Sequence, residues 1–282
     1  MTNTASPTPL PDATRLGRSA LRVADLDEMI EFYRTAVGLS VQSRGETRAT
    51  LGVDDTPLLV LLRDADAAPR TDRQAGLFHT AFRVPSRTAL GAALERVRDH
   101  WTLEGASDHL VSEALYLSDP EGNGVEIYCD RPREEWPRSD DGTVEMSTLP
   151  LDVDAIVSQS DSAADVPAGT DLGHVHLETT SLSAAREFYV ETLGLGVQID
   201  SDAALFLAAG DYHHHVGINT WNGRSEPAGG RGLAWFEIVV PGSDALAAVR
   251  DRLADAGVAV TDRSDGVEIA DTDGIGIRLR VE

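Results

Sequence analysis

The stretch LGRSALRVADLDEMIEFYRTAVGLSVQ, residues 16–42, returns 156 residues later as LGHVHLETTSLSAAREFYVETLGLGVQ, residues 172–198. Both copies carry EFY before a turn with Gly-Leu, and the same spacing places Gly76 on Gly232. One register that holds over so much of the chain indicates an internal duplication. We therefore expect two related halves.

A weaker echo lies inside each half, since RVADL (22–26) and RVPSR (83–87) each end a short apolar run and open a helical pattern. Apolar residues then recur at helical spacing, and alternating runs such as EALYLSDP (113–120) follow. This predicts one strand, one helix and about three strands, four times over. Because such a unit leaves one apolar sheet face uncovered, units must pair. We expect an α+β fold of curved mixed sheets with helices outside.

The turn-rich stretches divide the chain. We predict a flexible tail at 1–13, a first domain at 14–130, a linker with a short helix at 131–169, and a second domain at 170–282.

The charge of the chain is strongly one-sided. Its 282 residues include 47 acidic and 24 basic side chains, for a net charge of −23, and every basic residue is Arg. Such an excess suits a salt-loaded cytoplasm, where counterions screen the self-repulsion. An acidic protein from a GC-rich genome is the alternative. In either case nucleic acid and anionic membranes are excluded as expected partners.

Cys129 is the only cysteine, so neither an intramolecular disulfide nor a cysteine-based metal cluster is expected. The first 15 residues lack a basic start and an apolar run, which argues against a signal peptide. No stretch reaches the roughly 18 apolar residues of a membrane span. We expect a cytoplasmic protein.

Several motifs resemble the vicinal oxygen chelate superfamily, which includes glyoxalase I, fosfomycin and bleomycin resistance proteins and extradiol dioxygenases. They are the repeated EFY segment, GLFH (76–79), DPEGNGVEIY (119–128), LGHVHL (172–177) and GDYHHHVGINTW (210–221). Together they are most similar to two-domain bacterial catechol 2,3-dioxygenases. The resemblance implies four βαβββ units in two tandem domains, paired into cups.

The resemblance also implies a metal site, because members of this superfamily take their ligands from the first and last strands of the units. The matching positions here are His79, Glu126 and His174. Two histidines and one carboxylate form the facial set of non-haem Fe(II) oxygenases, with Mn(II) or Zn(II) as alternatives. Each residue taken alone could equally be a satisfied core or edge residue.

The other cup would hold Arg18, Trp235 and Arg278 at the equivalent positions. Guanidinium groups carry no free lone pair for a metal, so we expect that copy to be structural.

Further polar residues surround these ligands in the sequence. Consecutive residues on a strand point to alternate faces, so at most two of the histidines at 213–215 share one. We expect His215 to act as an acid or base, although it could be a fourth ligand or a solvated residue. The remaining catalytic candidates are His109 and Tyr128, and the substrate-binding candidates are His176, His213, Asn219 and Trp221. A turn histidine and core aromatic residues are the plain alternatives.

These expectations favour an extradiol dioxygenase that cleaves a small aromatic diol with O2. A glyoxalase-like isomerase or a fosfomycin-type thiol transferase could use the same ligands. No Glu occurs between Asp211 and Trp221 to supply a second carboxylate, which counts against the isomerase. A binding protein of the bleomycin resistance kind would need no metal. The sequence leaves a homo-oligomer possible.

Overall fold

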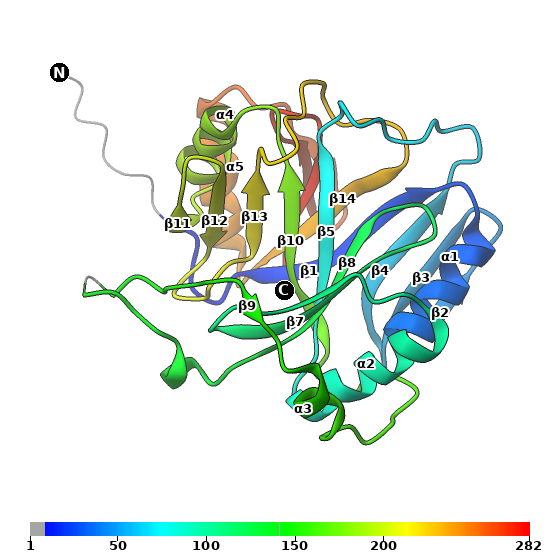
Figure 1. Cartoon of the computed structure of the whole chain (residues 1–282). Helices are drawn as coiled ribbons and strands as arrows, with labels where there is room; N and C mark the ends of the chain where they lie inside the picture. Colours follow the sequence, from blue (N-terminus) through cyan, green and yellow to red (C-terminus); the bar gives the residue numbers. More distant parts are fainter. Residues whose placement is uncertain (1–8, 141) are drawn as a thin grey trace.

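The computed structural model describes residues 9–140 and 142–282 and contains the four predicted βαβββ units (Figure 1). The first half comprises β1 (Arg15–Val23), α1 (Leu26–Phe32), η1 (Tyr33–Val37), β2 (Ser40–Arg44), β3 (Arg48–Val53), β4 (Thr56–Arg63), β5 (Gly76–Arg83), α2 (Arg87–His100), β6 (Gly105–Asp108), β7 (Ser112–Ser118) and β8 (Gly124–Asp130). The second half comprises β10 (Asp171–Glu178), α4 (Leu182–Arg186), η3 (Glu187–Thr192), β11 (Gly196–Asp200), β12 (Ala204–Ala208), β13 (Val216–Asn219), β14 (Gly232–Val240), α5 (Ser243–Asp255), β15 (Thr261–Arg263), β16 (Gly266–Ala270) and β17 (Gly276–Val281).

Each sheet combines one unit from each half. An eight-stranded sheet runs β15-β16-β17-β14-β1-β4-β3-β2, and a nine-stranded sheet runs β11-β12-β13-β10-β5-β8-β7-β6-β9, where β9 is Leu149–Pro150. The first strands of the paired units lie antiparallel, β1 with β14 and β5 with β10. The second unit therefore meets the third, and the first meets the fourth. The α+β fold of two tandem repeats with mixed sheets is confirmed.

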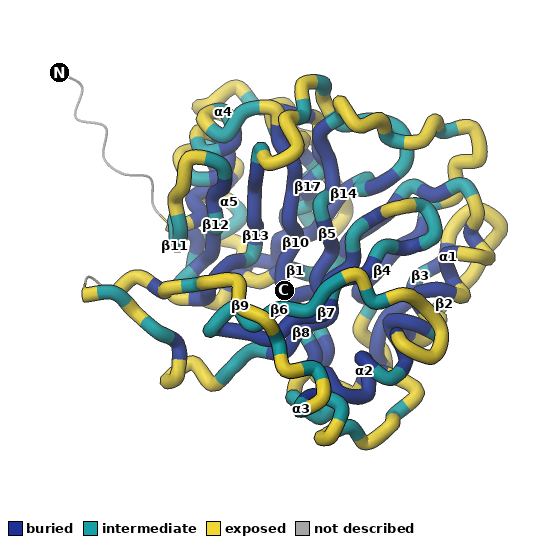
Figure 2. Tube along the Cα trace, in the orientation of Figure 1, coloured by how far each residue is buried: buried dark blue, intermediate teal, exposed yellow. Residues whose placement is uncertain are grey.

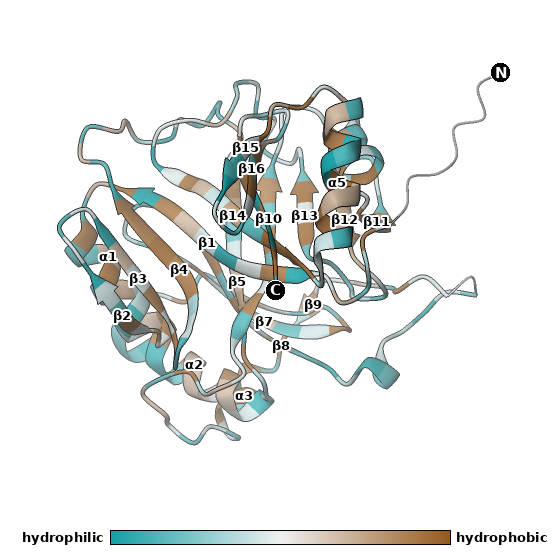
Figure 3. Ribbon diagram, turned by 180° about the vertical axis from the view of Figure 1, so that it is seen from behind, coloured by the Kyte–Doolittle hydropathy of each residue, from teal (hydrophilic) through white to brown (hydrophobic). Residues whose placement is uncertain are grey.

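Helices α1, α2, α4 and α5 lie outside the sheets and pack against them (Figures 1 and 3). In α2, Leu90, Leu94 and Val97 repeat at helical spacing and are fully buried. The hydroxyl of Ser86 accepts a hydrogen bond from the amide of Ala89 and caps this helix. Figure 2 shows burial concentrated in the central strands, as a continuous core requires.

The segment between the halves is more structured than a linker. It contains η2 (Arg133–Glu135), β9 (Leu149–Pro150) and α3 (Val153–Val157), and β9 extends the nine-stranded sheet beside β6. Of the predicted tail, residues 1–8 lie outside the described residues. Leu10 is buried, and its amide donates to the carbonyl of Gly194. Within the described ranges, no helix combines the length and the hydrophobicity that crossing a membrane requires.

Candidate metal centre

Three buried side chains meet on one face of the nine-stranded sheet. His79 lies on β5, Glu126 on β8 and His174 on β10. Ala81, two residues beyond His79, pairs with both Glu126 and His174 across the neighbouring strands. Residues two apart on a strand share a face, so all three polar groups project to the same side. The small side chain of Ala81 leaves the space between them open.

The three side chains have the geometry of metal ligands. The Nε2 atoms of His79 and His174 are 3.2 Å apart, and they lie 3.0 and 3.2 Å from Oε2 of Glu126. With metal–ligand bonds of about 2.1 Å, two ligands at right angles lie about 3.0 Å apart. The donor atoms therefore fit three mutually perpendicular positions around one ion. This is the arrangement of a two-histidine, one-carboxylate site.

The protonation states also suit a metal. Burial lowers the pKa of His174 to about 4, so its imidazole is neutral. Burial would raise the pKa of Glu126, but His174 and His79 hold it well below its usual range. Neutral imidazole and ionised carboxylate are the forms that bind metals.

The backbone brings further side chains to this face. Pairing between β10 and β5 passes from His176–His79 to Leu177–Leu77, so Phe78 is the extra residue of a β-bulge. A bulge re-aims side chains, and both Phe78 and His79 line the pocket. On a regular strand Phe78 would point away from the face that carries His79, so the sequence did not predict it as a pocket residue.

His176 lies beside the candidate ligands and also lines the pocket. Its Nε2 accepts a hydrogen bond of 3.0 Å from the side-chain amide of Asn219, which is fully buried behind the pocket wall. A Cβ on Gly217 would lie 2.9 Å from the His176 ring, so this glycine makes room for the imidazole. Trp221 is 51% exposed and lines the pocket. Asn219 is thus placed to orient His176, and does not line the cavity itself.

The three consecutive histidines separate in a way that corrects two expectations. His214 lines the pocket, with its ring centroid 4.1 Å from that of His174. His215, expected at the metal, instead accepts a hydrogen bond from the amide of Ala209 and lines a separate cavity. His213, expected to bind substrate, is buried behind His214 and outside the pocket lining. The reason is that β13 begins only at Val216, so strand alternation does not apply to the preceding turn.

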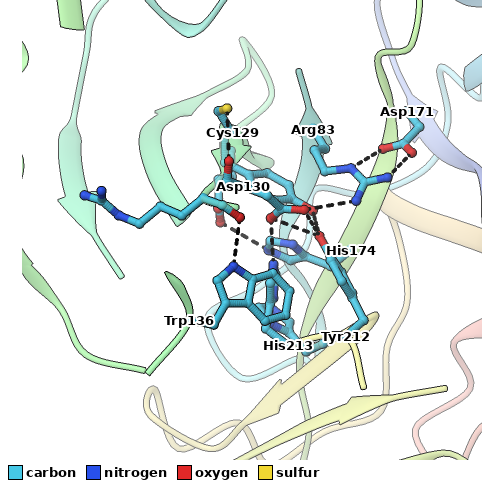
Figure 4. A network of polar contacts seen from close by, with 12 residues as sticks. Arg83, Cys129, Asp130, Trp136, Asp171, His174, Tyr212 and His213 are labelled. Carbon is cyan, nitrogen blue, oxygen red and sulfur yellow. Dashed lines mark hydrogen bonds and ion pairs between the residues drawn. The ribbon is translucent and has the colours of Figure 1, made fainter. Parts of the chain in front are cut away.

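His213 connects His214 to the partly buried carboxylate of Asp130. Figure 4 shows His213 beside Asp130. Nε2 of His213 lies 3.0 Å from Oδ1 of Asp130, and the Nδ1 atoms of His213 and His214 are 2.8 Å apart. A carboxylate only accepts, so a neutral His213 donates from Nε2 and accepts at Nδ1. His214 must then donate from Nδ1, which leaves Nε2 with a free lone pair. We call this arrangement the Asp130–His213–His214 chain.

Several groups hold Asp130 in its charged form. It accepts hydrogen bonds from Arg83 at 3.0 Å and from the hydroxyl of Tyr212 at 3.1 Å. Burial would raise the pKa of Asp130, but its hydrogen bonds with His213 and Arg83 and the charge of Arg83 lower it. Arg83 is in turn paired with Asp171 (Figure 4).

Tyr128 does not reach the pocket, contrary to the expectation that it could donate to substrate. Its ring packs 4.9 Å from that of His174, and its hydroxyl lies 2.7 Å from the hydroxyl of Tyr212. Tyr212 already donates to Asp130, so Tyr128 donates to Tyr212. A Cβ on Gly173 would lie 1.8 Å from the Tyr128 hydroxyl, which explains why glycine occupies that position.

A second polar group faces the ligands from β7. Tyr116 is the cross-strand partner of Glu126, and its hydroxyl lies 2.7 Å from Nε2 of His109. Nδ1 of His109 donates to the carbonyl of Ser147 at 2.7 Å, so Nε2 of a neutral His109 accepts from Tyr116. Burial and the charge of Glu126 raise the pKa of Tyr116, which keeps its proton. His109 was predicted from the sequence and Tyr116 was not, although its position opposite Glu126 in the hairpin was the signal for it.

These groups surround a cavity of about 510 Å³. Pockets of this size hold small organic ligands. The lining consists of Phe78, His79, Ser107, His109, Ser112, Tyr116, Glu126, Met146, Ser147, Thr148, His174, His176, Ile199, Phe206, His214 and Trp221. Residues 146–148 come from the segment between the halves, because β9 holds it beside β6.

The eight-stranded sheet carries different residues at the equivalent positions. The guanidinium of Arg278 lies 3.7 Å from the ring centroid of Trp235, and Arg18 donates to Glu237 at 2.8 Å. Among the described residues, His79, Glu126 and His174 form the one group that could hold a metal ion.

Comparison with known proteins agrees with this architecture. The model of the Glyoxalase/Bleomycin resistance protein/Dioxygenase superfamily matches residues 15–127 and 171–279. A catechol-2,3-dioxygenase from Bacillus subtilis (strain 168) is 34% identical over 273 residues, which cover 94% of this chain and 96% of that protein.

Two solved structures share the fold at low sequence identity. Glyoxalase I from Zea mays gives a TM-score of 0.61 at 16% identity, over 95% of this chain and 92% of that one. The cppA protein of Streptococcus pneumoniae TIGR4 gives 0.54 at 10% identity, over 95% and 99%. The chain belongs to the Glyoxalase/Bleomycin resistance protein/Dioxygenase superfamily.

Proposed function

We propose that this protein is an extradiol dioxygenase that opens a catechol ring with O2. The observation that carries the proposal is the facial set of His79, Glu126 and His174 beside a neutral histidine with a free ring nitrogen. Fe(II) is the metal we propose, and Mn(II) and Zn(II) are the alternatives to test. The metal would supply binding sites for both diol oxygens and for O2.

His214 is the proposed acid–base residue. Burial, together with His174 and His213, lowers its pKa well below the usual value, so it is neutral. Nε2 of His214 would take a proton from one diol hydroxyl and later return a proton to the opened product. The Asp130–His213–His214 chain keeps that nitrogen unprotonated before substrate binds and stabilises the imidazolium afterwards.

His109, Tyr116 and His176 are further polar aromatic side chains that line the pocket. We propose that the Tyr116 hydroxyl, whose proton is directed at His109, reorients to donate to a substrate or oxygen atom beside Glu126. His176, held by Asn219, would position the ring. Both side chains orient reactants without changing their own charge.

The chain resembles a curated catechol-2,3-dioxygenase along almost its whole length, which supports this function over its rivals. An isomerase would need a second carboxylate near the metal, and Glu126 is the only carboxylate among the pocket-lining residues that the structure describes. A metal-free binding protein would gain nothing from the three ligand positions.

The test combines metal analysis with oxygen uptake. We expect about one Fe(II) per chain after anaerobic loading, and catechol-dependent O2 consumption with a yellow ring-opened product. Glu126→Gln should lose both metal and turnover. Glu237→Gln removes a buried carboxylate from the other sheet and is the matched control. Bound metal without oxygen uptake would leave the site standing and refute the dioxygenase function.

A further inference from the structure

The floor of the pocket changes from polar to apolar side chains along one row of the nine-stranded sheet. The pairing registers align Gly124, His79, His176, Gly217, Phe206 and Ile199 across β8, β5, β10, β13, β12 and β11. Strands lie about 4.8 Å apart, so Phe206 is three strands, or at most roughly 14 Å, from His79. The candidate ligand His79 therefore lies toward one end of the row, and the bulky apolar side chains of Phe206 and Ile199 lie at the other.

Aromatic side chains enclose the far half of this row. The ring of His176 lies 5.2 Å from Phe78, 5.1 Å from Trp221 and 5.5 Å from Phe206, measured between centroids. Ile199 pairs with Phe206 on the adjacent strand, and Met146 reaches the pocket from the segment between the halves. We call Phe78, Met146, Ile199, Phe206 and Trp221 the apolar end of the pocket.

This end of the pocket offers no cationic partner to a negative charge. The described lining residues include neither Arg nor Lys, and the one charged side chain among them is Glu126. Arg224, which follows Trp221 in the sequence, is already paired with Glu178, and Arg131, which follows Glu126, is paired with Asp108. An anionic ring substituent would lose its hydration without a partner, in a chain of net charge −23.

We propose that the pocket selects catechols that carry an uncharged apolar substituent, alkyl or aryl, directed over His176 toward Phe206 and Ile199. This inference rests on the proposed function, because it places the diol at the metal ligands. The cavity of about 510 Å³ leaves room beyond a single ring along this row. Trp221, half exposed at the pocket, would close against the substituent.

The experiment compares two diols of similar size, one with an uncharged apolar substituent and one with an anionic substituent. 4-Isobutylcatechol presents an apolar branch where 3,4-dihydroxyphenylacetate presents a carboxylate, and 3,4-dihydroxyphenylacetamide is the polar, uncharged reference. We expect kcat/KM for the isobutyl compound to exceed that for the carboxylate by at least about 100-fold, with the amide between them. Comparable values for the two would overturn the inference.

Substitution of Phe206 tests the direction of the substituent. Phe206→Arg places a cation at the apolar end, and we expect it to raise the carboxylate-to-isobutyl ratio by at least about tenfold. Phe206→Leu keeps the site apolar and is the matched control, in which the isobutyl compound should still be preferred. A ratio unchanged by Phe206→Arg would show that the substituent points elsewhere and would refute the assigned direction.

A binding measurement separates this inference from the dioxygenase function. Anaerobic titration of the Zn(II)-loaded protein with the same diols reads affinity without turnover, through quenching of tryptophan fluorescence. Tighter binding of the isobutyl compound without oxygen uptake in the Fe(II) form would support the pocket preference and refute the proposed reaction. Oxygen uptake together with equal affinities for the two diols would support the proposed reaction and refute the pocket preference.

Discussion

Replacing Asp130 by Asn should reverse the direction of every hydrogen bond in the Asp130–His213–His214 chain. In the wild-type protein Oδ1 of Asp130 accepts from His213, while Oδ2 accepts from Arg83 at 3.0 Å. Arg83 can only donate, so it fixes the amide oxygen of an Asn on its own side. The amide nitrogen then faces Nε2 of His213 and donates to it.

The reversed hydrogen bonds change which ring nitrogen of His214 carries the proton. His213 would carry its proton on Nδ1 and donate to Nδ1 of His214, so the proton of His214 would move to Nε2. The residue would present a donor where the reaction needs a base. A correctly placed general base is worth about 10²–10⁴-fold in rate, and we expect kcat to fall by that factor. Unfolding free energy should fall by only about 1–3 kcal/mol, since Arg83 keeps Asp171.

Steady-state oxygen uptake, metal content and anaerobic diol affinity together check this prediction. Metal content should be unchanged, because Asp130 contacts none of the candidate ligands in the hydrogen-bond network. Asp171→Asn removes the other carboxylate partner of Arg83 without touching His213, and it should retain kcat within about threefold. A kcat for Asp130→Asn as high as that of the control would refute the assigned proton positions.

Three other predictions follow from the same structure. Tyr116→Phe removes the 2.7 Å hydrogen bond to His109 and should lower kcat about tenfold with full metal content, measured by oxygen uptake. Burial lowers the pKa of His215 to about 3, so its neutral form adds stability above pH 6.5 that is lost on acidification. Between pH 7.5 and 5 the wild-type protein should therefore lose about 2 kcal/mol more unfolding free energy than His215→Asn, measured by urea titrations. An equal loss in the two proteins would contradict the lowered pKa of His215. Finally, a melting temperature that is the same in dilute buffer and in multimolar KCl would refute the proposed adaptation to a salt-loaded cytoplasm, since screening the charge of −23 should raise it.

The duplication and the superfamily motifs predicted the fold, the pairing of units and the positions of His79, Glu126 and His174. These positions follow from strand register, which a sequence repeat records directly. Local departures from regular strands escaped prediction. The bulge at Phe78 and the turn before Val216 decide which side chains enter the pocket, and no periodicity reports them. The same holds for residues 146–148, which reach the pocket only because β9 joins a sheet edge.

The two sheets satisfy equivalent buried polar positions in different ways. In the nine-stranded sheet Glu126 is surrounded by two imidazoles, and in the eight-stranded sheet Arg278 takes the equivalent position and stacks on Trp235. A buried carboxylate remains nearby in the second case as Glu237, but it is held by Arg18 at 2.8 Å and Arg280 at 3.3 Å. Buried charge must be paired in either case. Arginine–carboxylate pairs neutralise the buried charge within the protein, whereas His79 and His174 place ligand nitrogens beside Glu126. The difference between Arg278 and Glu126 therefore marks which of the two duplicated sites has a ligand set for a metal.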